Sequence, residues 1–212
     1  MSRLLPLPLL ASLLLAGACA HPPQVARPYQ PSSRALERAE LVSRLKRDLI
    51  KVDRAIAVTE RLIGESRSAP YLPDLLFRLA ELHVEKSRYR FHLEAELHSE
   101  AGKKGSLVVP DVTLLKQKAV SLYERITREF PEFAQGDQVL FFTAHEYREL
   151  GDYDKALAAY AQLVEKHPKS SLVAESLLIV ADYHFDKSEL DKAEVNYLQV
   201  LEQPVSPAHD LA

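Results

Sequence analysis

Apolar residues recur at intervals of three or four along most of the chain, which is the spacing of one face of an α-helix. In the first such stretch they run at alternating intervals from Val42 to Ile63. The pattern favours an all-α fold, with helices predicted over residues 34–65, 73–100, 113–129, 138–150, 153–166, 172–186 and 189–201.

A repeat of 37 residues organises these helices. Three segments begin with Lys-Ala, carry a Tyr four residues after the Ala, and align without gaps at 118–123, 155–160 and 192–197. A second set of alanines follows at a constant interval of 25 residues, in the pairs Ala55 and Ala80, Ala119 and Ala144, and Ala156 and Ala181. Alanine lets two helices approach closely, and the Tyr one turn later fills the space beside it. The repeat therefore predicts stacked helix pairs.

The first predicted helix, over 34–65, has two interpretations. Its apolar seam fits a coiled coil, and it also fits packing against the next helix along the chain. Because Ala55 keeps the repeat's interval to Ala80, we favour packing, as the second helix of a leading half-repeat.

The segment 137–170 resembles the tetratricopeptide repeat family. The residues at the family's signature places are Leu140, Ala144, Tyr147, Gly151, Ala156, Tyr160 and Pro168. The segment departs from the family at Thr143 and Ala144, where Leu-Gly is usual, and at Leu140, where Trp is usual. The resemblance implies a right-handed α-solenoid of about three and a half repeats over 34–204, and a scaffold that binds proteins without catalysis.

In that family the first helix of each unit lines a partner-binding groove. The matching positions here are Asp74, Phe77, Glu81, Val84, Glu85, Gln138, Phe141, His145, Arg148, Glu149, Glu175, Leu178, Asp182, Phe185 and Asp186. Acids dominate this set and apolar residues lie near its middle, so the resemblance implies a basic and apolar peptide partner, extended or helical. Alternatively, the acids form a solvated face and the phenylalanines belong to the core.

The first unit contains an insertion at about 90–116. Part of it continues a helix, and part is a loop with Gly102, Lys103, Lys104 and Gly105. Insertions in solenoids map to one face and often carry function, whereas a tolerated surface loop is the plainer interpretation.

The N-terminus has the features of an export signal. Arg3 precedes a short apolar run, and Ala16-Gly17-Ala18-Cys19 resembles the bacterial lipobox, with Ala16 where Leu is usual. We predict a lipoprotein signal peptide over 1–18, lipid on Cys19, the only cysteine, and a Pro-rich tether over 19–33. Because residue 20 is not Asp, the lipobox resemblance implies an outer-membrane anchor facing the periplasm. An ordinary secretory signal that happens to contain a Cys is the alternative.

Composition and motifs argue against several classes of function. The chain carries 27 Lys+Arg against 30 Asp+Glu, a net charge of -3, which offers no basic footprint for nucleic acid. It contains no HExxH, phosphate-loop or dinucleotide-binding motif. We therefore expect no enzyme activity, no metal and no cofactor.

The end of the chain bears on how the last predicted helix is covered. The segment 205–212 does not read as a capping helix, so we expect a partner, a second copy or further chain to cover the helix at 189–201.

The sequence leaves two functions open. The first hypothesis is an envelope scaffold that binds other envelope proteins in outer-membrane assembly, motility or secretion machinery. The alternative is a structural envelope spacer or self-associating lipoprotein that acts through its tether and first helix.

Overall fold

The regular elements are all helices in the parts of the chain that the structure, a computed structural model, describes, namely residues 32–100 and 107–203. They are α1 (Ser33–Glu65), α2 (Leu72–Glu100), α3 (Pro110–Glu129), α4 (Gly136–Glu149), α5 (Tyr153–Lys166), α6 (Val173–Asp186) and α7 (Leu190–Leu201). The predicted all-α fold is confirmed.

The largest difference from the predicted boundaries is at the start of α3, which begins at Pro110 rather than at residue 113. A proline is tolerated in the first turn of a helix because its missing N–H would have no partner there. The predicted insertion therefore divides into the last turns of α2, the segment 101–106 outside the described residues, and the first turns of α3.

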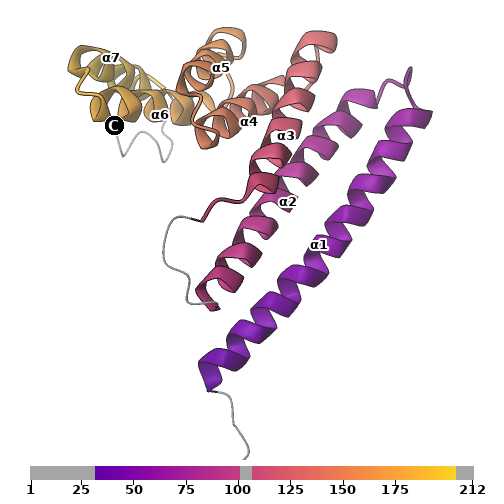
Figure 1. Cartoon of the computed structure of the whole chain (residues 1–212). Helices are drawn as coiled ribbons and strands as arrows, with labels where there is room; N and C mark the ends of the chain where they lie inside the picture. The colour runs from indigo at the N-terminus through magenta and orange to yellow at the C-terminus, as the bar shows by residue number, and fades with distance from the viewer. Residues whose placement is uncertain (1–31, 101–106, 204–212) are drawn as a thin grey trace, which may run out of the picture.

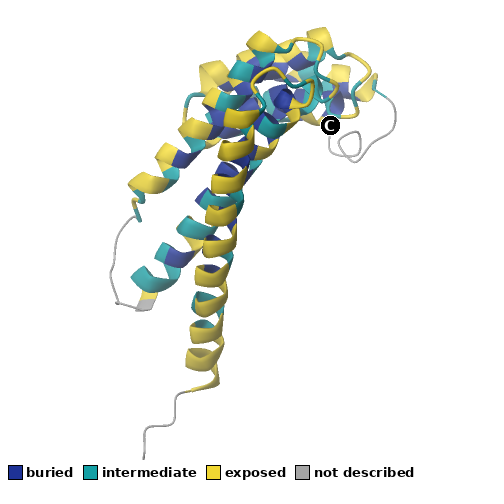
Figure 2. Ribbon diagram, turned by 90° about the vertical axis from the view of Figure 1, so that its right-hand side faces the viewer, coloured by how far each residue is buried: buried dark blue, intermediate teal, exposed yellow. Residues whose placement is uncertain are grey.

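Consecutive helices run antiparallel and stack in chain order (Figure 1). Each helix packs mainly on its neighbours in the sequence, as expected for a solenoid. α1 lies along α2, which confirms that it packs on the next helix of its own chain. These two helices project beyond the shorter helices as a two-helix arm (Figure 2).

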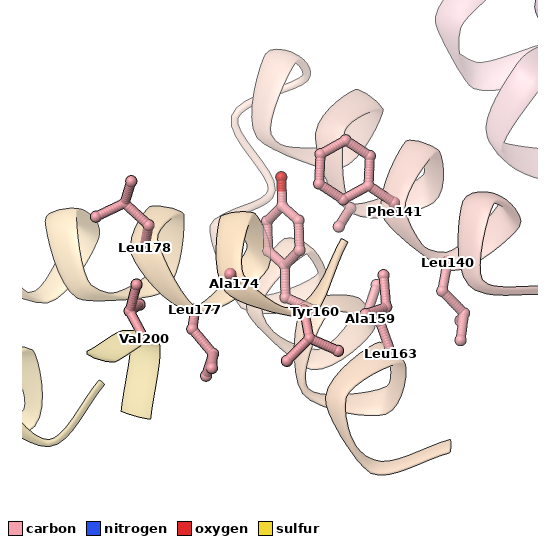
Figure 3. Packing of buried hydrophobic residues seen from close by; sticks show 11 residues of the cluster. Leu140, Phe141, Ala159, Tyr160, Leu163, Ala174, Leu177, Leu178 and Val200 are labelled. Carbon is pink, nitrogen blue, oxygen red and sulfur yellow. The ribbon is translucent and has the colours of Figure 1, made fainter. Parts of the chain in front are cut away.

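The repeat alanines lie at the closest helix contacts. Ala80, Ala119, Ala144 and Ala181 are 0% exposed, and Ala156 and Ala193 are 2% exposed. Large side chains fill the space around them, as Tyr160, Leu163 and Val200 do between α4 and α7 (Figure 3). A second cluster, with Leu76, Phe77, Tyr123 and Ile126, joins α2 to α3 and α4. The prediction that the alanines are packing residues is confirmed.

The arm has its own small core. Leu45 and Leu49 of α1 pack against Leu93 of α2. At its tip, the Arg38 Nε donates to Glu96 Oε2 at 2.8 Å, and its Nη2 donates to Ser99 Oγ at 2.7 Å. The arm is therefore held together by packing and by side-chain pairing along its length.

Candidate protein-binding groove

A hollow of about 570 Å³ opens where the first helices of three successive units meet. Residues of α2, α4 and α6 line it, with Tyr123 of α3. Of the residues that the sequence assigned to a groove, it contains Glu81, Val84, Glu85, Phe141, His145 and Glu175. We call this the central hollow.

A second hollow, of about 340 Å³, lies further along between α4, α5 and α6, and we call it the distal hollow. It contains four more of the sequence-assigned residues, which are Arg148, Glu149, Asp182 and Asp186. Tyr153 and Tyr183 stack in its wall with ring centroids 5.3 Å apart. The distal hollow thus combines acidic groups with an aromatic surface.

The other five assigned residues lie elsewhere. Phe77 and Leu178 are buried core residues, 6% and 9% exposed, and line neither hollow. Asp74 and Phe185 are exposed outside both hollows, and Gln138 is half-buried near the start of α4. The packing supports the core interpretation for Phe77 and Leu178, and also for Phe141, which lines the central hollow but is only 8% exposed and belongs to the same core cluster as Leu178.

The central hollow is closer to neutral than the assigned positions indicate. Arg78 and Arg88 also line it, and the Arg78 guanidinium lies 3.2 Å from Glu81 Oε2. Sequence reasoning missed both arginines, because the family's groove positions sample only part of each helix face. In the distal hollow Arg148 lies with three acids, of which Glu149 also lies 3.6 Å from the ammonium of Lys116, so both hollows keep a small excess of acids.

A buried ion pair lies at the floor of the central hollow. Glu146 is 3% exposed, and its Oε2 lies 3.0 Å from the ammonium of Lys116. Burial acts to raise the pKa of Glu146, but hydrogen bonding and charge from His145 and Lys116 outweigh it, so the pKa is lowered from its usual value. This pair fixes α3 against α4.

The repeated tyrosines have different hydroxyl partners. Tyr197 donates to Asp182 Oδ1 at 2.7 Å, from α7 to α6. One repeat earlier, Tyr160 lines the distal hollow and its buried hydroxyl has no partner among the described residues. Burial raises the pKa of Tyr160 to about 12. At the position equivalent to Asp182, His145 turns instead towards Glu146, with 3.6 Å between Nδ1 and Oε1.

His83 of α2 is a core histidine. It is 5% exposed, and its Nδ1 has no hydrogen-bond partner in the described part of the chain. Burial, with the nearby charges of Lys118 and Lys86, lowers the pKa of His83 to about 4. The imidazole is therefore neutral at pH 7.

No group of three or more His, Cys, Asp or Glu side chains in residues 32–100 and 107–203 is arranged to hold a metal ion. Within the same stretches, no helix is both long and apolar enough to span a membrane. The signal over 1–18, Cys19, nearly all of the tether and the 205–212 tail lie outside the described residues.

Comparison with known proteins identifies the class of the repeat. The family model described as "Tetratricopeptide repeat" matches residues 147–170, which cover the end of α4, all of α5 and the turn that follows. Such repeats stack into scaffolds whose concave surfaces bind other proteins. No curated protein sequence matches the chain.

Two solved structures are similar at low sequence identity. The crystal structure of MamA has 15% identity and a TM-score of 0.38, covering 74% of this chain and 91% of that chain. The crystal structure of BtubC (BKLC) from P. vanneervenii has 18% identity and a TM-score of 0.37, covering 74% of this chain and 72% of that chain.

Proposed function

We propose that this protein is a non-catalytic scaffold that holds a segment of a partner protein in the central and distal hollows. The observation that carries the proposal is that ten of the residues assigned to a groove line two hollows formed by successive repeat units. A segment lying there would contact α2, α4 and α6.

The chemistry of the hollows selects the partner. Glu149, Asp182 and Asp186 favour basic side chains at the distal end, and Tyr153 and Tyr183 offer an aromatic surface for their stems or for an apolar side chain. We infer a basic and apolar segment of an envelope protein as the partner.

Anchorage belongs to the same proposal. Lipid on Cys19 would hold the protein at the periplasmic face of the outer membrane, within a complex of outer-membrane assembly, motility or secretion machinery. A signal sequence that ends at the only cysteine supports this location. Mass analysis of the N-terminal peptide tests it, because an unmodified Cys19 would exclude the anchor.

Site-directed photocrosslinking in the native host tests the groove. A crosslinking amino acid at His145 or Asp182 should capture the same partner, because these positions lie in the central and distal hollows. The matched control is Glu165, an exposed residue of α5 that lines neither hollow. Equal capture from all three positions would exclude a specific groove.

A further inference from the structure

The outer face of α1 carries an exposed stripe that is both basic and apolar. Arg47, Ile50, Arg54, Val58 and Arg61 are all exposed and follow one another at intervals of three or four residues. This spacing places them along one face of the helix, opposite the face that packs on α2. No acid lies on that face between Arg47 and Arg61. We call these five residues the α1 stripe.

The outer face of α7 carries an exposed stripe that is apolar and contains one acid. Leu190, Leu198 and Leu201 are 59%, 54% and 44% exposed, and Glu194 lies between them on the same face. From the start of α6 to the end of α7, over residues 173–201, there are six acids and two lysines. We call Leu190, Glu194, Leu198 and Leu201 the α7 stripe.

The repeat shows that this end of the molecule is a stacking face. Tyr153, one repeat before Leu190, stacks on Tyr183 of the following unit. Ala161, one repeat before Leu198, is itself exposed, so the repeat assigns a stacking role to position 190 and not to position 198. Among the described residues nothing packs over Leu190 or Leu198, although the position of Leu190 faces the next unit wherever one follows.

The two stripes cannot meet within one molecule. α1 and α7 lie at opposite ends of the structure, with the other helices between them (Figure 1). A contact between the two stripes therefore requires two copies of the chain. Head-to-tail contact between unlike faces builds an open chain of copies when the successive rotations do not close, and a ring when they do.

We propose that copies of this chain associate head to tail, with the α1 stripe of one copy packed on the α7 stripe of the next. Both stripes follow helical spacing, so the two helices can pack ridge against groove with Arg54 and Glu194 near the middle of the contact. The apolar side chains supply the contact area, and the charges select the unlike face over the like one. This surface is separate from both hollows.

Sedimentation velocity of the full chain in non-ionic detergent tests the proposal. We expect species larger than a dimer, growing with protein concentration and becoming smaller in 0.5 M salt, which screens exposed charges. A monomer at every concentration would overturn the proposal, and so would a dimer that grows no further.

Two variants identify the faces. The triple variant Arg47→Glu, Arg54→Glu, Arg61→Glu reverses the α1 stripe, and Leu190→Ser, Leu198→Ser removes the apolar part of the α7 stripe. Each should be monomeric alone, whereas a mixture of the two should form a dimer and nothing larger, because each retains one intact face. Circular dichroism verifies that both remain folded.

The matched control is Arg128→Glu, Lys166→Glu, Lys169→Glu, which makes the same charge change at exposed positions outside both stripes. It should assemble like the unaltered chain. Loss of assembly in this control would overturn the assigned contact. A dimer that the α7 variant dissociates and the α1 variant leaves intact would also overturn it, because the contact would then not involve the α1 stripe.

Discussion

Ser188 adopts the same left-handed backbone conformation as Gly151, which lies one repeat before it. The φ angles are 59° at Ser188 and 82° at Gly151, and both residues lie in the turn between the two helices of a unit. Glycine reaches this region without steric cost, whereas a residue with a Cβ is strained there. The third unit therefore contains a strained turn that the second unit avoids.

Replacing Ser188 with Gly should stabilise the protein by about 1 kcal/mol, because it relieves the strain of a left-handed residue that carries a Cβ. Urea unfolding monitored by circular dichroism measures the change. Gly151→Ala is the matched control and should destabilise by about 1 kcal/mol, since its backbone would become strained although no atom crowds the added Cβ. A Ser188→Gly variant less stable than the parent would contradict this account.

Tyr160→Phe should leave stability unchanged or raise it by about 1 kcal/mol, because the buried hydroxyl that it removes has no partner among the described residues. Tyr197→Phe should lower stability by about 1 kcal/mol, because it removes a hydrogen bond to Asp182. Thermal unfolding of the two variants side by side measures the difference. Equal losses would show that the Tyr160 hydroxyl has a partner in solution.

Lys116→Met should destabilise the protein by about 3 kcal/mol at pH 7, because it leaves the buried carboxylate of Glu146 without its cation. The loss should shrink as the pH falls, because burial without the cation raises the pKa of Glu146 in the variant, so that Glu146 is neutralised there at a higher pH than in the parent. Chemical unfolding of parent and variant at pH 7 and pH 4 measures both effects. The control is the double variant Lys116→Met, Glu146→Gln, which should recover most of the stability lost at pH 7. Equal losses of stability in the single and the double variant would contradict the assigned contact.

His83 should make folding less favourable in mild acid. Its pKa is about 4 in the folded state against 6.5 when exposed, so the unfolded chain binds the proton more readily between these values. Stability should therefore fall as pH drops from 6.5 towards 4, by about 2 kcal/mol at pH 5 from this residue. Comparison of the parent with His83→Gln over pH 5–7 isolates the contribution, and parallel pH profiles would contradict it.

The helix pairs were predictable from the repeat, because alanines at a fixed interval mark the positions where two helices approach most closely. Ala80, Ala144 and Ala181 all lie at fully buried positions, as their interval from the preceding alanines predicted. The start of α3 was less predictable, since Pro110 is compatible both with a loop and with a first helical turn.

The groove was only partly predictable from sequence. The first helix of each unit packs on two sides, so its apolar residues have similar spacing whether they point to the core or to a hollow. Phe141 and Phe77 are both core residues, 8% and 6% exposed, but only Phe141 also lines the central hollow. Which of these occurs depends on how neighbouring helices cross, and a single sequence does not contain that information.

The arm gives the protein a defined mechanical path. A pull on Ser33 along the arm loads α1 in tension over about 50 Å, the length of a 33-residue helix. The force then passes through the short connection to Leu72, which is 4% exposed in the same core cluster as Tyr123. Tension applied at the N-terminal end of α1 therefore reaches the core beside the central hollow without having to separate α1 from α2.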